Sequence, residues 1–320
     1  MLDTIIIDGL SFALPLFIMA IGGIYCERSG ITNLAIEGLQ GFGAFFGALW
    51  IVIISSFFNI PINKLFYLAL LLSMVGGMLF SIIHALLCIK FKANQVISGV
   101  VINILSTALT TFLTTQINSL VFGELSDKFQ IGTSVRFSVP LLSEIPVLGA
   151  IFKNLYPFEI VIIVIAIIAA YVLNKTRFGL RLRACGDNPH SVDAAGVDVY
   201  KVQFKAVLVS GALSGLGGIS FAYSISTNFS PAIYMGYGYL AIAALIFGNW
   251  NILPTFGACL LFGFARSGGY ALAQILKMPS TFSDLIMILP YVVTLLLLIF
   301  FSKTNRAPRA LGEIYDKGKR

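Results

Sequence analysis

The stretch NKTRFGLRLRACGDNPHSVDAAGVDVYKV, residues 174–202, is the longest run without a hydrophobic block in this sequence. It separates two apolar runs, 158–174 and 204–225, each close to the ~20 residues that a helix needs to cross a bilayer. Such runs recur along all 320 residues, of which 58% are hydrophobic and 11% charged. Soluble domains carry about 25% charged residues. The sequence therefore predicts an all-α polytopic membrane protein.

Nine membrane spans follow from these runs, with a short seventh and an interrupted eighth: 4–25, 33–58, 65–89, 95–120, 158–174, 204–225, 237–249, 254–275 and 283–302. Alternating them across a bilayer places 15 of the 21 Lys and Arg residues on one side. Basic residues gather in cytoplasmic loops, so this side, with the segment 175–203, the tail 303–320 and the C-terminus, is predicted to be cytoplasmic. The N-terminus and the segment 121–157 are then external, and 121–157 is a lid, an interfacial helix, a docking surface or a plain loop.

The net charge of +7 is explained by this asymmetry and does not indicate nucleic-acid binding. The cysteines at 26, 88, 185 and 259 form no C-x-x-C pair and no metal-binding spacing. The motifs G-x-x-x-x-G-K-[ST], H-E-x-x-H and G-x-S-x-G do not occur. We therefore expect no catalytic site, metal or cofactor on this chain, and any ATP hydrolysis is expected on a partner.

A short helix is predicted inside the polar stretch, from His190 to Ala195. Asn188 is expected as its N-cap, Pro189 as its first residue, and Gly196 in the left-handed position after its last turn. Asp198 is expected to cap the next span. Because so short a helix is unstable alone, it needs a surface, which is its own bundle, the lipid interface or a cytoplasmic partner. The side chains available for a partner's groove are Val192, Ala194 and Ala195.

Long motifs in this chain resemble the permease subunits of ATP-binding-cassette importers of the ribose and nucleoside type. The segment 174–218 resembles their coupling region, with Asp193-Ala194-Ala195-Gly196 at the "AA-G" signature. The resemblance continues through ERSGITNLAIEGLQGFGAFFGA (27–48), NQVISGVVINIL (94–105) and GYGYLAIAALIFGNWNILP (236–254). It covers most of the chain and is strongest toward nucleoside permeases, with simple-sugar and branched-chain amino acid permeases close by.

The resemblance implies one transmembrane permease domain, 1–320, with the type II importer fold of about eight to ten helices in a bacterial cytoplasmic (inner) membrane. It implies a cytoplasmic ATPase subunit that holds ATP and Mg, a second permease in a heterodimer, and an external substrate-binding protein or lipoprotein. A nucleoside or simple sugar would cross by alternating access. The residues implied in ATPase coupling are Asn188, Pro189, His190, Val192, Asp193, Ala194, Ala195 and Gly196.

Polar residues near the second and fourth spans are candidates for the translocation path. Asn33 and Glu37 lie on one helical face, and a carboxylate within a span is a functional candidate by default. The alternative is that both brace the turn before this span. Ser98 and Asn103 are five residues apart, which predicts different sides of a helix and at most one of them on a path. Buried amides also commonly hold neighbouring helices together.

Aromatic and basic residues supply further candidates. Phe221 and Tyr223 either belong to an interfacial aromatic belt or stack on nucleobases in transit. Arg266 lies within the eighth span and needs a partner, for which Asp284 and Asp8 are the candidates, and the glycines at 268 and 269 predict a helix break beside it. The alternative function is a secondary transporter driven by an ion gradient, in which Glu37 is the ion site.

Small residues on the sixth span predict a close helix contact. Gly211 and Gly215 are four residues apart and therefore lie on one face. Such pairs let two helix backbones approach each other. The contact is either inside the chain, which the sequence favours, or at a dimer seam.

Overall fold

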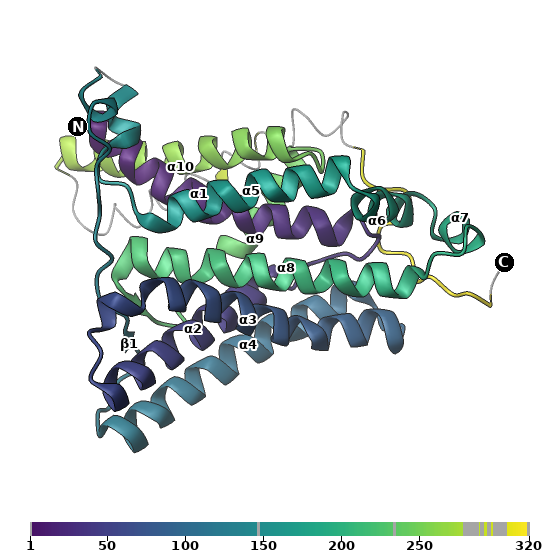
Figure 1. Ribbon diagram of the computed structural model, residues 1–320, viewed down its shortest axis with the longest axis horizontal. Coiled ribbons are helices and arrows are strands. Elements are labelled where there is room, and N and C mark those ends of the chain that lie inside the picture. The colour runs from purple at the N-terminus through teal and green to yellow at the C-terminus, as the bar shows by residue number, and fades with distance from the viewer. Residues whose placement is uncertain are drawn as a thin grey trace.

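The computed structural model describes residues 2–145, 148–232, 235–277, 288, 291–292, 296 and 306–318. Almost all of the secondary structure there is helical (Figure 1). Six helices, some continued by shorter helical turns, are long and apolar enough to cross a membrane: Leu2–Glu27, Ile36–Phe58, Ile62–Lys90, Gln95–Phe122, Pro157–Lys175 and Val199–Ser226. The all-α polytopic prediction is confirmed, and this is a multi-pass membrane protein.

Eight of the nine predicted spans correspond to helices, and the ninth, 283–302, falls largely outside the described residues. The membrane helices are α1 (Leu2–Glu27), α2 (Ile36–Phe58), α3 (Phe66–Ala85), α4 (Gln95–Ile117), α5 (Pro157–Lys175), α8 (Val199–Phe221), α9 (Tyr237–Phe247) and α10 (Ile252–Ile275). Single π-type turns extend three of them: η2 (Leu86–Lys90) follows α3, η3 (Asn118–Phe122) follows α4, and η6 (Ala222–Ser226) follows α8.

The predicted break in the eighth span is wrong, because α10 continues through Gly268 and Gly269 to Ile275. A glycine costs a helix only about 1 kcal/mol relative to alanine. Packing overrides that cost, since Ser267, Gly269 and Ala271 are buried against the bundle. The short seventh span is confirmed as the eleven-residue helix α9.

Helix α8 lies at the centre of the bundle, between a layer of α1, α5 and α10 and a layer of α2, α3 and α4 (Figure 1). Small residues allow this close packing. A Cβ on Gly211 would overlap the carbonyl oxygen of Gly77, and a Cβ on Gly215 would overlap that of Ser73, both on α3. The glycine pair on the sixth span therefore forms a contact inside the chain, as the sequence favoured.

Short elements close one end of the bundle. The strands β1 (Phe129–Gln130) and β2 (Asn228–Phe229) pair antiparallel, with Phe129 opposite Phe229. Three 3-10 turns lie at the same end: η1 (Ile62–Leu65), η4 (Leu142–Glu144) and η5 (Leu148–Phe152). In the described part of 121–157 no helix is long enough to span a membrane.

The other end, which we call the basic end, carries the short helices α6 (Arg177–Asp187) and α7 (Pro189–Ala194) and the tail 306–318 (Figure 1). The connection between α1 and α2 and the connection between α3 and α4 also lie there. The described basic residues of this end include Arg28, Lys92, Lys175, Arg177, Arg181, Arg183, Arg306, Arg309 and Lys317.

Candidate functional site

Helix α6 was not predicted from the sequence, in which its residues were described only as a basic run. The Thr176 side chain is its N-cap and accepts a hydrogen bond from the Gly179 N–H at 3.2 Å. Its buried face contains Leu182 and Cys185, while Arg181 is exposed. The threonine cap and the apolar spacing 178, 182, 185 were the signals in the sequence that would have revealed it.

Helix α7 begins and ends where the sequence predicted, within one residue. The Asn188 side chain accepts from the Ser191 N–H at 3.1 Å, and Pro189 is the first helical residue. Gly196 has φ +77°, the left-handed conformation that favours glycine. The local cap residues thus fix a rigid elbow between α6 and α8.

Asp198 caps α8, which enters the bundle directly after α7. Its carboxylate accepts from the Lys201 N–H at 3.1 Å and pairs with the Lys201 ammonium at 3.1 Å. The backbone hydrogen bond and the ion pair both lower the pKa of Asp198 below its ordinary value. The cap therefore stays charged near neutral pH, and a connection of only four residues, 195–198, joins α7 to α8.

The two faces of α7 differ in what they contact. Pro189 is buried, and Val192 is 7% exposed and belongs to the main core of the bundle. The expectation that Val192 fills a partner's groove is therefore wrong, because it anchors the helix to its own chain. The exposed residues, which we call the α7 tip, are His190, Ser191, Ala194, Ala195 and Gly196.

Glu37 lies in the first turn of α2 and holds the first turn of α9. One carboxylate oxygen accepts from the Gly236 N–H at 2.5 Å, and the other accepts from the Gly238 N–H at 2.6 Å. Gln40 donates to the same carboxylate at 3.0 Å. A negative charge is stabilising at a helix N-terminus, where backbone N–H groups lack partners. This arrangement favours a bracing role in which Glu37 holds the start of α9, a contact that the sequence did not predict.

Asn33 and Glu27 brace the connection between α1 and α2 from inside. Asn33 is fully buried and donates to the Ser210 hydroxyl of α8 at 2.7 Å. The Glu27 carboxylate accepts from the Trp250 indole N–H at 2.6 Å. Asn33 therefore joins this connection to the central helix, and Glu27 joins it to the turn before α10.

Ser98 and Asn103 are both buried and face different neighbours, as their five-residue spacing predicts. They lie at the two edges of one wide buried face of α4, which spans residues 95, 98, 99, 102, 103, 106, 110 and 114. Ser98 contacts His84 Nδ1 at 2.8 Å. Asn103 accepts from the Gly38 N–H at 2.7 Å and donates to the Leu34 carbonyl at 2.8 Å. These contacts hold α4 on α2 and α3.

Phe221 and Tyr223 are buried among other rings. The Phe221 ring centroid is 4.8 Å from that of Tyr237 and 5.2 Å from that of Phe12. Tyr223 instead points to Phe66 of α3, at 4.7 Å. The two residues therefore face different neighbours and do not form one stacking platform.

Arg266 lies on α10 among aromatic rings. Its guanidinium carbon is 4.5 Å from the Phe12 ring centroid and 5.3 Å from that of Tyr270, which are cation–π distances. It also donates to the Tyr237 hydroxyl at 3.4 Å. Within the described residues it forms no ion pair, so Asp8 is not its partner, and Asp284 lies outside them.

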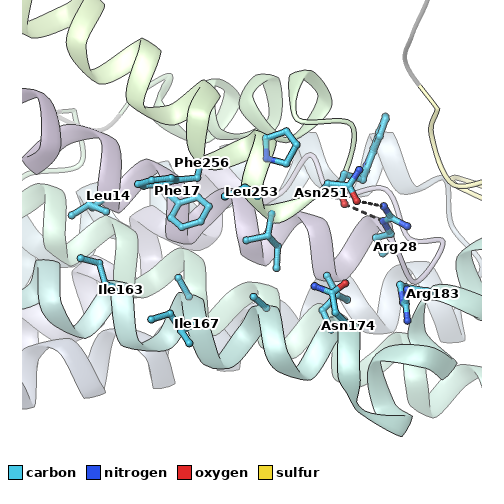
Figure 2. A pocket seen from close by; sticks show the side chains of 16 residues that line it. Leu14, Phe17, Arg28, Ile163, Ile167, Asn174, Arg183, Asn251, Leu253 and Phe256 are labelled. Carbon is cyan, nitrogen blue, oxygen red and sulfur yellow. Dashed lines mark hydrogen bonds between the residues drawn. The ribbon is translucent and has the colours of Figure 1, made fainter.

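A groove of about 460 Å³ runs between α5 and α10, with α1 as its floor (Figure 2). Its walls are mainly apolar and include Phe17, Ile163 and Phe256. Polar side chains gather at its basic end, where Arg28 donates to Asn251 at 3.1 Å. The groove therefore leads along the membrane helices toward α6, whose Arg183 is among its lining residues.

A second, polar chamber of about 290 Å³ lies further along the same helices, at the end opposite α7. Arg136 stacks over the Tyr156 ring, 4.2 Å from its centroid, and also donates to its hydroxyl. Other residues lining the chamber are Asp8, Ser11, Phe12, Ser224, Ile225, Arg266, Ser267, Tyr270 and Gln274. The chamber and the groove are both lined in part by residues of α1 and α10, and they share no lining residue.

Comparison with known proteins identifies the kind of molecule that carries these features. Residues 5–301 match the family described as "Branched-chain amino acid transport system / permease component". The chain belongs to this permease family. It is 38% identical over 325 residues to the guanosine ABC transporter permease protein NupQ of Bacillus subtilis, covering 100% of this chain and 98% of that protein.

Two further relatives of the permease are also named as nucleoside or guanosine transporter permeases. It is 37% identical to the nucleoside ABC transporter permease protein NupC of Lactococcus lactis, over 99% of this chain and 98% of the relative. It is also 26% identical to the guanosine ABC transporter permease protein NupP of Bacillus subtilis, over 95% of this chain and 82% of the relative. No solved structure matches the chain.

The bracing role of Glu37 predicts the result of its replacement. In Glu37→Gln, one of the two carboxylate oxygens becomes an NH₂ group, so the Gly236 or Gly238 N–H loses its acceptor. We expect the free energy of unfolding of the permease to fall by about 1–3 kcal/mol. A lower melting temperature in detergent would report this loss, with exposed Glu124→Gln as the control. An unchanged melting temperature together with altered ion dependence of uptake would instead identify Glu37 as an ion site.

Proposed function

We propose that this permease is the membrane subunit of an ATP-driven importer for nucleosides. The observation that carries the proposal is the α7 tip, an exposed surface of mostly small residues on a capped helix that is joined to α8 through the Asp198 cap. The full-length similarity to two permeases named for guanosine and nucleoside transport supports the choice of substrate. The α7 tip is suited to insertion into a groove of a cytoplasmic ATPase subunit, which holds the ATP and Mg.

In this proposal the basic end faces the cytoplasm of a bacterial inner membrane. ATP binding and hydrolysis move the ATPase groove and carry α7 with it. Because α8 contacts α1, α2 and α3, a tilt of α8 rearranges most of the bundle. The ATPase drives transport only if it binds the two conformations of the permease with different affinity.

Two further partners belong to the proposal. NupQ and NupP are both named as guanosine transporter permeases of one organism, and this chain resembles both. This supports a heterodimer of this permease with a second, related permease. An external binding protein or lipoprotein delivers the nucleoside to the end that carries the polar chamber.

We further propose that the nucleoside passes along α1, α5 and α10, through the polar chamber and then the groove. The side chains of Glu37, Asn103 and Phe221 are engaged in contacts within the chain, and these residues support the path rather than line it. An apolar wall suits a conduit, since a solute in transit must not be held tightly. The open side of the groove is then closed by the second permease.

The path can be tested with a thiol block, because all four native cysteines are free and buried. Ile163→Cys places a thiol on the groove wall, and Val101→Cys places one on α4, away from the groove. The two native side chains are similarly exposed, at 47% and 48%. We expect a bulky, membrane-permeant maleimide to inhibit uptake in Ile163→Cys about tenfold more than in Val101→Cys. Equal inhibition of both variants would contradict the path.

The function itself is tested by purification and reconstitution. An N-terminally tagged permease, extracted gently from its native membrane, is expected to bring down an ATPase and a second permease in stoichiometric amounts. The complex in proteoliposomes should then take up guanosine only with ATP on the α7 side. A complex without an ATPase, with uptake driven by an ion gradient, would establish the secondary-transporter alternative.

A further inference from the structure

The tail 306–318 crosses the whole basic end and contacts the ends of helices that are far apart in sequence. Its backbone N–H groups donate to the Gly186 carbonyl at the end of α6, at 2.8 Å from Ala310, and to the Gly30 carbonyl between α1 and α2, at 3.0 Å from Gly312. The Arg306 N–H donates to the Asn249 side chain before α10, at 2.7 Å. The backbone N–H groups of the tail thus donate hydrogen bonds to the end of α6, to the connection between α1 and α2, and to the turn before α10.

The second half of the tail continues to α3, α4 and α7. Asp316 pairs with Lys92 at 2.9 Å, and the Glu313 carbonyl accepts from Gln95 at 3.5 Å. The ion pair raises the pKa of the Lys92 ammonium, with the hydrogen bond to Asp316 as the largest cause. This half therefore reaches the connection between α3 and α4, on the opposite layer of the bundle from α5.

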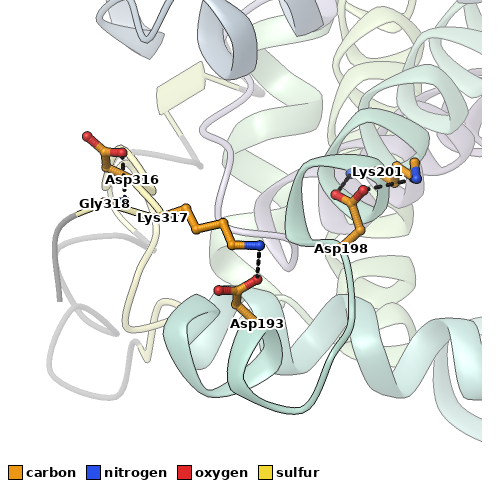
Figure 3. Close-up of polar contacts among 6 residues, drawn as sticks. All are labelled: Asp193, Asp198, Lys201, Asp316, Lys317 and Gly318. Carbon is orange, nitrogen blue, oxygen red and sulfur yellow. Dashed lines mark hydrogen bonds and ion pairs between the residues drawn. The ribbon is translucent and has the colours of Figure 1, made fainter.

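Tyr315 and Lys317 make the contacts between the tail and α7. The Tyr315 ring centroid is 5.1 Å from that of His190 on α7 and 5.2 Å from that of Tyr200 on α8. Tyr315 is only 6% exposed. Lys317 forms an ion pair with Asp193 of α7 at 3.4 Å (Figure 3). One side of α7 is therefore covered by the tail, while the α7 tip stays exposed.

We infer that residues 306–318 are a strap that fixes α7 to the membrane helices, and that Tyr315 and Lys317 are positioning residues for ATP-driven transport. The inference rests on the proposed function, since it assigns a role to the strap in the same coupling. It concerns how force is passed from α7 to the bundle, and not where the ATPase binds.

Helix α7 needs the support of the strap because it is small. A six-residue helix is unstable alone and would bend under load. Pro189 and Val192 anchor one side of it, and the strap adds an aromatic contact and an ion pair on another. Through Gly30, Gly186 and Lys92, the strap also ties α7 to both layers of the bundle. With the strap in place, a push on α7 moves the whole basic end as one unit.

The experiment measures nucleosides taken up per ATP hydrolysed, in proteoliposomes that contain the whole importer. For Tyr315→Ala we expect this ratio to fall about tenfold, the size typical of coupling between two sites, while the ATPase still co-purifies. Tyr315→Phe keeps the ring and should keep the ratio. Ile314→Ala is the matched control, because this neighbouring side chain is 48% exposed.

A charge exchange tests the ion pair and separates the strap from ATPase docking. Asp193→Lys alone should lower the ratio, and Asp193→Lys combined with Lys317→Asp should restore much of it. If Asp193 acted only on the ATPase, the second change would bring no rescue, and the role of Lys317 would be overturned. A wild-type ratio in Tyr315→Ala would overturn the strap, whereas absence of nucleoside uptake by the wild-type importer would overturn the proposed function itself.

Discussion

Folded permease should fail to accumulate in the membrane when Gly215 is replaced by leucine. Gly43 of α2, Gly77 of α3 and both Gly211 and Gly215 of α8 meet at one point, where a Cβ on Gly215 would overlap the Ser73 carbonyl oxygen. The clash is with backbone atoms, so no side-chain rotation relieves it. Overpacking of this kind costs more than about 3 kcal/mol, out of a total stability of about 5–15 kcal/mol.

The measurement is the monodisperse peak of a fluorescent fusion in size-exclusion chromatography. Gly257→Leu is the matched control, because it makes the same change in a long membrane helix where a Cβ would have no described neighbour within 4 Å. It should give a normal peak. Normal yield and melting temperature for Gly215→Leu would mean that α3 and α8 are further apart than described, and would remove the basis for placing α8 at the centre.

Uptake should be abolished by Ala195→Trp, in a protein that is otherwise folded. Ala195 is exposed on the α7 tip, so an indole there can project into solvent without disturbing the core, but it prevents the tip from entering a groove. Blocking the centre of an interface typically costs 2 kcal/mol or more, which predicts a loss of at least about 30-fold in ATPase affinity. Gly196 is less suitable for this test, since its φ of +77° would add backbone strain to the effect of size.

Two readouts distinguish this outcome from misfolding. The yield and melting temperature of Ala195→Trp should equal those of the wild type, while the amount of co-purified ATPase falls. Ala195→Ser, which changes the size of the side chain little, should retain uptake. Unchanged uptake in Ala195→Trp would show that α7 does not transmit the driving force, and would favour the ion-driven alternative.

The sequence predicted those features that depend on near neighbours. Asn188, Pro189 and Gly196 each act through contacts within a few residues, so the caps of α7 were evident before the structure. The membrane helices were likewise predicted from continuous apolar runs. Helix α6 was missed because its arginines, which are compatible with many structures, obscured the threonine cap.

Features that depend on distant contacts were not accessible from the sequence. The Glu37 carboxylate accepts hydrogen bonds from N–H groups 199 and 201 positions away in the sequence, and no local sequence pattern predicts these bonds. The guanidinium of Arg266 lies among aromatic rings from α1, α9 and α10 itself. Sequence reasoning had proposed only carboxylates, Asp8 and Asp284, as its partners. The sequence identified which residues were unusual but not what each one touches.

The position of the strap in the chain also orders the steps by which the permease is made. Lys317 follows Asp193 by 124 positions, and α8, α9 and α10 lie between them. A ribosome therefore delivers these helices to the membrane before the residues that secure α7 emerge. During synthesis α7 is held on one side only, and it gains its remaining support after the bundle has been inserted. In the importer proposed above, an ATPase subunit would consequently meet a firmly held α7 only on a permease whose membrane helices are already in place.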